Sequence, residues 1–161
     1  MNRLTVWLFG GSGGASPLAD LGLLWLRLFS GITIAFAHGI GKLPPKPGLI
    51  ETTGKLGFPL PELFSWAAGL AEFGGGILVA IGLLTRPAAA FLVFTMLVAA
   101  FGLHGADPFS DQELALLYSS IFFVYLLSGP GRFSLDALLR QRQTAAPESD
   151  RVEADRVGST R

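Results

Sequence analysis

Residues 88–103 form a segment with no charged side chain on any face. The segment contains only Ala, Phe, Leu, Val, Thr, Met and Gly. In a soluble four-helix bundle, each helix carries a polar stripe opposite its buried face. Because residues 88–103 have no such stripe, they are typical of a helix surrounded by hydrocarbon. The sequence therefore predicts a membrane protein rather than a soluble bundle.

Three more long apolar segments accompany this one, at residues 17–41, 61–85 and 114–129. Asp20, Arg27 and His38 are the only ionisable residues in the first, and Glu72 is the only charge past the first turn of the second. A helix of about 20 residues is roughly 30 Å long, which matches the hydrocarbon core of a bilayer. The pattern predicts an all-α fold, a transmembrane four-helix bundle over residues 17–139.

The two ends of the chain differ from this middle part. Ser16 and Pro17 are typical of a helix start, so residues 1–16 are expected to form a flexible or interfacial leader. Its apolar run is too short for a typical signal peptide. Residues 140–161 are polar and charged with little to bury, and this composition predicts a disordered tail.

Charge and cysteine content exclude several classes of function. The 161 residues include twelve Lys and Arg and twelve Asp and Glu, so the net charge is zero with neutral histidines. This lacks the basic field that nucleic-acid binding requires. With no cysteine, disulfides, iron–sulfur clusters and thiolate zinc sites are excluded. No metal-ligand spacing is present and no metal site is predicted, so a redox role needs a bound organic cofactor or haem.

Basic residues near the predicted spans indicate the orientation in the membrane. Four spans place the N-terminus, the turn at residues 85–87 and the C-terminus on one side. That side carries five arginines, and the opposite loops carry Lys42, Lys46 and Lys55. Because cytoplasmic loops are enriched in Lys and Arg, both termini are predicted to be cytoplasmic, in a bacterial inner membrane.

Ionisable groups within a span are costly and tend to face the bundle interior. Arg27 shares a helical stripe with Gly31, Ala35 and His38, and Glu72 lies on a similar stripe of the second segment. Helix geometry places Arg27 about 9 Å and Glu72 about 18 Å from the cytoplasmic face, within reach of a long side chain. The pair is expected either to serve function or to be a structural ion pair that fixes helix register.

The two histidines end the first and third segments, so His38 and His104 are expected at one level of the membrane. Lys42 and Asp107 lie near them in sequence, and Tyr118 lies on a polar stripe of the fourth segment. A helix-terminal histidine is commonly a capping residue. Bis-histidine haem ligation and a histidine-lined quinone site are the functional alternatives, with quinone the preferred one.

Six motifs occur in a fixed order along the membrane part. They are HGIGKL (38–43), GFPLP (57–61), EFGGGILVAIGLLTRPAA (72–89), HGADPF (104–109), ELALLY (113–118) and GPGRFSLD (129–136). Over residues 20–139 the sequence resembles the DoxX family of small bacterial membrane proteins. The resemblance implies a four-span subunit related to those of a thiosulfate:quinone oxidoreductase. The family-like polar residues are Arg27, His38, Lys42, Glu72, Arg86, His104, Asp107 and Glu113.

Together these features favour a DoxX-like membrane subunit of a quinone-linked oxidoreductase complex. The expected partners are the lipid bilayer and either other redox subunits or further copies of the chain. The alternatives are a non-catalytic assembly or scaffold protein and a small-solute permeation protein. The predicted polar intramembrane site is expected to hold a quinone or a small oxyanion, and it consists of Arg27, His38, Lys42, Glu72, His104, Asp107 and Tyr118.

Overall fold

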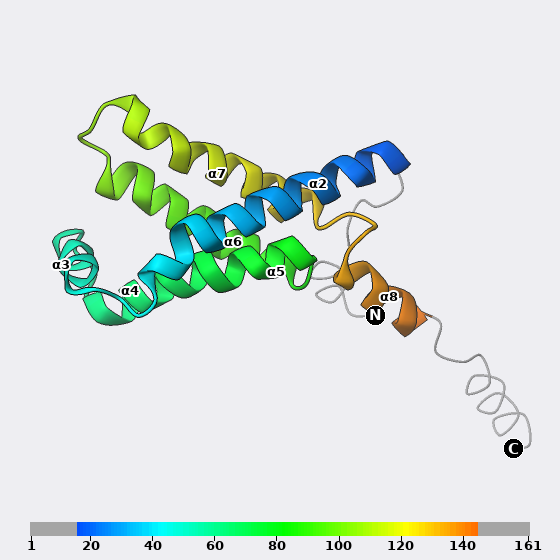
Figure 1. Cartoon of the computed structure of the whole chain (residues 1–161), viewed down its shortest axis with the longest axis horizontal. Coiled ribbons are helices and arrows are strands. Elements are labelled where there is room, and N and C mark those ends of the chain that lie inside the picture. The colour runs from blue at the N-terminus through cyan, green and yellow to red at the C-terminus, as the bar shows by residue number, and fades with distance from the viewer. Residues whose placement is uncertain (1–15, 145–161) are drawn as a thin grey trace, which may run out of the picture.

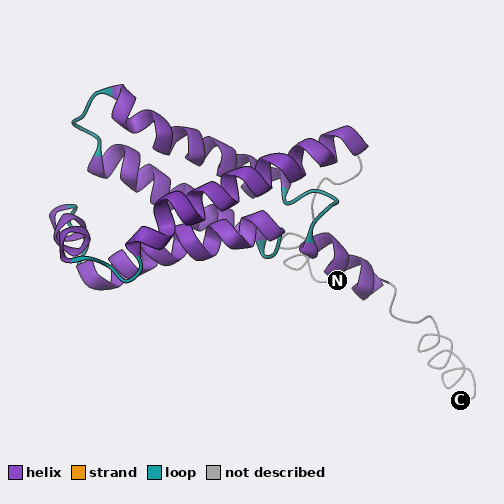
Figure 2. Cartoon of the chain, viewed as in Figure 1, coloured by secondary structure: helices purple, strands orange, loops and turns teal. Residues whose placement is uncertain are grey.

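A computed structural model describes residues 16–144, and this part of the chain contains helices and no strands (Figure 2). The helices are α2 (Pro17–Thr33) with η1 (Ile34–Gly39) and η2 (Ile40–Lys42), α3 (Pro47–Lys55), α4 (Pro61–Leu70) with η3 (Ala71–Gly75) and α5 (Gly76–Ile81), α6 (Thr85–Leu97) with η4 (Val98–Leu103), α7 (Phe109–Ser128), and α8 (Leu135–Thr144). The segments η1, η3 and η4 are π-helical, and η2 is a 3₁₀ turn. The all-α fold predicted from the sequence is confirmed.

Four long helical segments form the body of the molecule (Figure 1). The helices α6 and α7 pack as an antiparallel pair, and α2 crosses them and packs on α5. The short helix α3 lies at one end beside α4, and α8 lies at the other end. Three segments are long and apolar enough to cross a membrane, Pro17–Lys42, Pro61–Ile81 and Thr85–Leu103. That α7 is the fourth span stays a prediction, since Asp111, Gln112 and Glu113 make its first turns polar.

The helices differ from the predicted boundaries at two places. Helix α8 continues across the predicted boundary at residue 139, and the predicted loop between the first two spans contains α3. The leader up to residue 15 and the tail from residue 145 lie outside the described residues.

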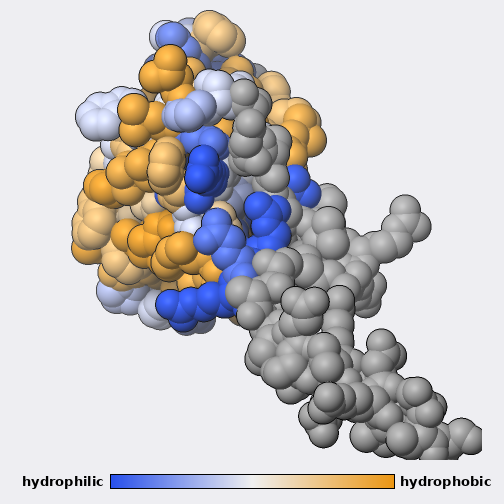
Figure 3. Space-filling view, turned by 90° about the vertical axis from the view of Figure 1, so that its right-hand side faces the viewer, coloured by the Kyte–Doolittle hydropathy of each residue, from blue (hydrophilic) through white to orange (hydrophobic). Residues whose placement is uncertain are grey.

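The distribution of polarity is the reverse of that in a soluble protein. Large apolar side chains face outward, with Trp25 71%, Phe91 65% and Phe101 62% exposed, while Arg27 and Glu72 are buried. Figure 3 looks onto the end that carries α8, where hydrophilic residues gather beside apolar flanks. In hydrocarbon an exposed phenylalanine is in a favourable solvent and an exposed charge is not. This surface supports the membrane assignment.

Small residues allow α2 and α5 to meet backbone to backbone. A Cβ atom added to Gly31 would lie 2.6 Å from the carbonyl oxygen of Gly76, and one added to Gly76 would lie 2.7 Å from that of Gly31. Such close approach is the usual way in which helices pack in membranes, where van der Waals contact replaces the hydrophobic effect. These two glycines therefore fix how closely α2 lies against α5.

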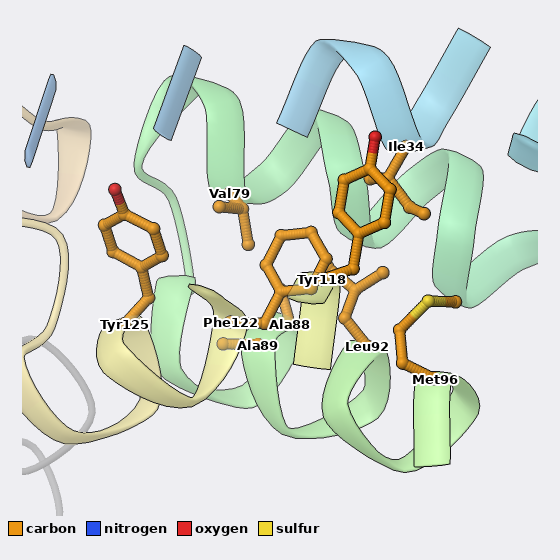
Figure 4. Packing of buried hydrophobic residues seen from close by; sticks show 9 residues of the cluster. All are labelled: Ile34, Val79, Ala88, Ala89, Leu92, Met96, Tyr118, Phe122 and Tyr125. Carbon is orange, nitrogen blue, oxygen red and sulfur yellow. The ribbon is translucent and has the colours of Figure 1, made fainter. Parts of the chain in front are cut away.

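The apolar core lies between α6, α7 and the helices that cross them (Figure 4). Phe122 and Tyr125 of α7 are fully buried and pack with Leu92 of α6 and Val79 of α5. The hydroxyl of Tyr125 donates a hydrogen bond to the carbonyl of Leu23, at 2.9 Å. This bond ties α7 to α2 without leaving a polar group unpaired in the core.

Arg27 and the chain between α7 and α8 form a clamp at the α8 end of the molecule. The guanidinium donates from Nε to the carbonyl of Ala80 (3.0 Å), from Nη1 to that of Pro130 (2.7 Å) and from Nη2 to that of Phe133 (2.5 Å). These acceptors belong to α5 and to the segment that links α7 with α8. A single buried side chain therefore joins three parts of the fold.

Asp136 completes the clamp from α8. Its carboxylate accepts hydrogen bonds from the backbone N–H groups of Leu84 (2.9 Å) and Thr85 (3.0 Å), where α6 begins. Its own N–H donates to the carbonyl of Gly82 at 2.9 Å. A carboxylate at a helix N-terminus also interacts favourably with the helix dipole. Much of the GPGRFSLD motif thus has a structural explanation.

We expect Asp136→Ala to lower the stability of the protein in detergent, because it leaves two backbone N–H groups without acceptors. The expected loss is about 2 to 6 kcal/mol, from roughly 1–3 kcal/mol for each of the two unsatisfied groups. The midpoint of denaturant unfolding measures the change. Asp111→Ala is the control, since Asp111 is exposed on α7. Equal midpoints for the two variants would contradict the clamp.

Candidate functional site

The seven predicted site residues do not form one cluster. In the structure they separate into Arg27 alone in the clamp, Lys42 with Glu72, His38 with Tyr118, and His104 with Asp107.

The pairing of Arg27 with Glu72 expected from the sequence is wrong. Arg27 donates to three backbone carbonyls at the α8 end, and Glu72 pairs with Lys42 instead. Arg27 and Glu72 lie at different levels of the helix pair, because Arg27 reaches Ala80 whereas Gly39 is the residue that meets Glu72. Arg27 precedes Gly39 by twelve residues, which corresponds to about 18 Å along the helix axis. The buried Arg27 has a structural role.

Lys42 and Glu72 form an ion pair, with 2.5 Å between Nζ and Oε1. The Glu72 side chain is fully buried, whereas that of Lys42 is 34% exposed. The second carboxylate oxygen of Glu72, Oε2, is buried and has no hydrogen-bond partner. A buried acceptor without a partner costs about 1–3 kcal/mol. The site therefore has the capacity to accept one more hydrogen bond.

Two π-helical turns position this pair. Glu72 lies in η3, which packs against η1 of the first helix. Gly39 permits this contact, because a Cβ there would lie 2.7 Å from the Cα of Phe73 and 2.8 Å from the carbonyl carbon of Glu72. Single π-helical turns occur frequently at functional sites, where they shift side chains out of the regular α pattern. Here they bring the last turn of the first helix onto Glu72.

The ion pair borders a cavity of about 230 Å³ between α3, α4 and α6. Most of its lining is apolar, and its polar side chains are Lys42, Glu72 and three threonines. The lining residues are Lys42, Leu49, Thr52, Thr53, Leu56, Phe58, Phe64, Ala67, Ala68, Ala71, Glu72, Phe91, Phe94, Thr95, Val98, Ala99 and Leu103. An apolar cavity with a few convergent polar groups is the usual form of a small-molecule site.

Helix α3 closes one side of the cavity and is held on α4 by two contacts. The hydroxyl groups of Thr53 and Ser65 lie 2.9 Å apart in a buried hydrogen bond. The rings of Phe58 and Phe64 pack with their centroids 4.7 Å apart. These residues were not predicted from the sequence as part of the site. Pro47, at the first position of α3, was the available signal for a helix in this loop.

His38 and Tyr118 meet on another side of the first helix. Their rings pack edge to face, with centroids 5.8 Å apart, and Tyr118 is 8% exposed. Neither residue lines the cavity beside Glu72. The pair therefore joins the first helix to α7 rather than contributing to the same site as Lys42.

His104 and Asp107 lie in the turn between η4 and α7. The Nδ1 atom of His104 is 2.9 Å from a carboxylate oxygen of Asp107, and the two side chains are 36% and 47% exposed. The carbonyl of Asp107 accepts a hydrogen bond from Gln112. These contacts order an exposed turn. Within residues 16–144, no group of three or more His, Asp and Glu side chains could hold a metal ion.

We expect Lys42→Met to destabilise the protein by roughly 3 kcal/mol, at the lower end of the range for a buried pair, because it leaves the buried Glu72 without its partly exposed counter-charge. Adding Glu72→Gln should restore most of this loss, since the buried charge is then removed. Unfolding of the single and double variants in detergent, analysed as a double-mutant cycle, measures the coupling. Additive effects would show that the two side chains do not interact in the folded protein.

Comparison with known proteins agrees with this membrane architecture. Residues 22–105 match the family DoxX, and residues 64–152 match the family TQO small subunit DoxD. Inner membrane protein YqjF of Escherichia coli strain K12 is 33% identical over 134 residues, which cover 78% of this chain and 97% of that protein. No solved structure is significantly similar to the chain.

Two further relatives carry names that bear on location and activity. The protein named "Putative oxidoreductase CatD" of Bacillus subtilis strain 168 is 32% identical, over 73% of this chain and 86% of its own length. Inner membrane protein YphA of Escherichia coli strain K12 is 28% identical, over 84% of this chain and 99% of its own length. The DoxX match covers more than half of the sequence and includes both Lys42 and Glu72. The chain belongs to the DoxX family of membrane proteins.

Proposed function

We propose that the chain is the membrane subunit of a quinone-linked oxidoreductase and that its cavity beside Lys42 and Glu72 binds the quinone ring. One observation carries this proposal. A fully buried carboxylate with an unpaired oxygen borders an apolar cavity, within reach of the lysine that neutralises it. The match to the small subunit DoxD and the oxidoreductase name of the Bacillus subtilis relative support the same class of function.

The size and lining of the cavity suit a single substituted ring. A cavity of about 150 Å³ holds a benzene molecule, and this one measures about 230 Å³. Phe58, Phe64 and Phe94 supply aromatic walls. Glu72 Oε2 would accept a hydrogen bond from a ring hydroxyl, and the ammonium of Lys42 would donate one to a ring carbonyl. The two polar residues thus complement both redox states of the ligand.

Lys42 and Glu72 also suit proton exchange. Glu72 would hold or release a proton at Oε2 beside the ring, and the partly exposed Lys42 would connect this buried carboxylate with the aqueous side. Bound quinone would supply a two-electron, two-proton redox couple. The chain has no cysteine to hold an iron–sulfur cluster. We therefore propose that a partner subunit delivers the electrons.

We expect Glu72→Gln to weaken binding of a tail-less quinone about tenfold or more, because a hydrogen bond to a charged group contributes about 1.5–3 kcal/mol. Quenching of tryptophan fluorescence in lipid nanodiscs measures the affinity, with Trp66 on α4 as one reporter. Glu62→Gln is the matched control, since Glu62 is exposed on the same helical segment.

Absence of saturable quinone binding to the wild-type protein would overturn the proposal. So would equal affinities for Glu72→Gln and Glu62→Gln. Either result would favour the scaffold alternative, in which the polar interior only fixes helix packing. Uptake of a small solute into liposomes that is lost with Glu72→Gln would instead favour permeation.

We also propose that the protein lies in the bacterial inner membrane with both termini in the cytoplasm. The relatives named as inner membrane proteins support the location. In the structure, Arg86, Arg132, Arg140 and Arg142 belong to the end with α8, and Lys46 and Lys55 to the end with α3. Lys42 pairs with Glu72 inside the protein, so the four arginines at the α8 end face two lysines at the other end, which supports a cytoplasmic α8 end.

Single cysteines test this orientation, since the chain has none of its own. In spheroplasts, a membrane-impermeant thiol reagent should label Ser110→Cys, in the first turn of α7, and leave Arg142→Cys unlabelled. Permeabilised cells should show labelling of both variants, because both positions are exposed in the structure. Labelling of Arg142→Cys alone in spheroplasts would show that the protein has the opposite orientation.

A further inference from the structure

An apolar groove leads away from the ring cavity along the seam between α4–α5 and α6. Its volume is about 440 Å³. The lining residues are Ala67, Leu70, Ala71, Gly74, Gly75, Leu78, Leu84, Pro87, Ala88 and Phe91. Ala67, Ala71 and Phe91 line both the groove and the ring cavity, so the two spaces are neighbours.

The groove owes its depth to small residues on its floor. A Cβ atom added to Gly74 would have no atom within 4 Å, so this position is open. At Gly75 an added Cβ would be in ordinary van der Waals contact with Leu92, at 3.4 Å, so α6 packs directly against this part of the floor. No lining residue of the groove carries a charge or a hydroxyl. The combined site is therefore polar at one end, beside Glu72, and wholly apolar along the rest.

We infer that this groove binds the isoprenoid tail of a membrane quinone whose ring lies beside Lys42 and Glu72. The inference rests on the proposed function, which concerns the quinone ring, and adds a binding site for the tail. Ala67 and Leu78 lie eleven residues apart on one helical segment, which corresponds to about 16 Å along its axis. The groove is thus long enough for several isoprenoid units.

Charge distinguishes this occupant from a phospholipid. A phosphodiester head group would bring a negative charge to the cavity where the carboxylate of Glu72 is buried. The charge of Lys42 is already paired with that carboxylate. A neutral ring with hydroxyl or carbonyl groups avoids this repulsion and satisfies Glu72 Oε2. The cavity of about 230 Å³ also fits one ring better than a glycerol backbone with two chains.

The experiment compares a tail-less quinone with homologues of increasing tail length in nanodiscs, with concentrations expressed per lipid. Lipid tails are as apolar as the groove, so the tail gains only packing contacts. We expect the longest homologue to bind wild-type protein about tenfold more tightly than the tail-less one, a gain of about 1.4 kcal/mol. Gly74→Phe should abolish this gain and leave the affinity for the tail-less quinone unchanged.

Gly22→Phe is the matched control, because a Cβ at Gly22 also meets no atom within 4 Å and this residue lies on α2, outside the groove. It should retain the full gain from the tail. Gly74→Leu provides a smaller obstruction should the phenylalanine variant fail to fold, and it should reduce the gain. Unfolding midpoints in detergent establish that each variant is folded.

Distinct results separate the two proposals. If no quinone binds the wild-type protein, the proposed function fails. If quinones bind equally well with and without a tail, or if Gly74→Phe weakens both equally, the tail groove is overturned while the ring site remains. A phospholipid that native mass spectrometry finds bound to wild type, and that the long-tailed quinone does not displace, also overturns it. The tail groove is also overturned if Gly74→Phe changes the oligomeric state of the protein and leaves the dependence of quinone affinity on tail length unchanged.

Discussion

The fold depends on pairing the polar groups that the helices carry into hydrocarbon, where water cannot satisfy them. Arg27 meets this requirement with three backbone carbonyls and Asp136 with two backbone N–H groups. Tyr125 does so by donating to a carbonyl of α2. Among the described carboxylates, Glu72 is the buried one that retains an oxygen without a partner. The hydroxyl of Thr85 is another buried polar atom without a hydrogen-bond partner, but unlike Glu72 it does not line the cavity beside Lys42.

The polar residues of the clamp and the polar pair beside the cavity lie in different parts of the molecule. The clamp of Arg27 and Asp136 lies at the end with α8, where it joins the starts and ends of helices. The Lys42–Glu72 pair lies beyond the glycine contact between α2 and α5, beside a cavity covered by α3. Because different residues perform the two tasks, a variant at Glu72 need not disturb the clamp. Glu72 lies in both the DoxX and the DoxD range, whereas Arg27 lies only in the DoxX range and Asp136 only in the DoxD range.

The departures from regular α-helix explain why these groups meet. A π-helical turn inserts one extra residue into the helical repeat and rotates the rest of the helix beyond it. Two such turns, at Ile34–Gly39 and Ala71–Gly75, face each other across Gly39. They carry the first helix to Lys42 in a rotation that directs its ammonium to Glu72. They also leave His38 on another side, against Tyr118. A regular helix would have kept Arg27 and His38 on one stripe.

The sequence by itself determined the all-helical fold, the membrane class and the family, because apolar segments of spanning length and ordered motifs are local properties of the chain. It also identified Glu72 as an ionisable residue within a span and placed Lys42 among the candidate site residues. Only the tertiary structure decided which residues pair, since a partner depends on helix rotation and crossing, and π-helical turns leave no local signal. For the same reason the sequence assigned Arg27 to the wrong partner and left the residues of α3 out of the candidate site. The hydrogen bond between Thr53 and Ser65 holds α3 beside the cavity.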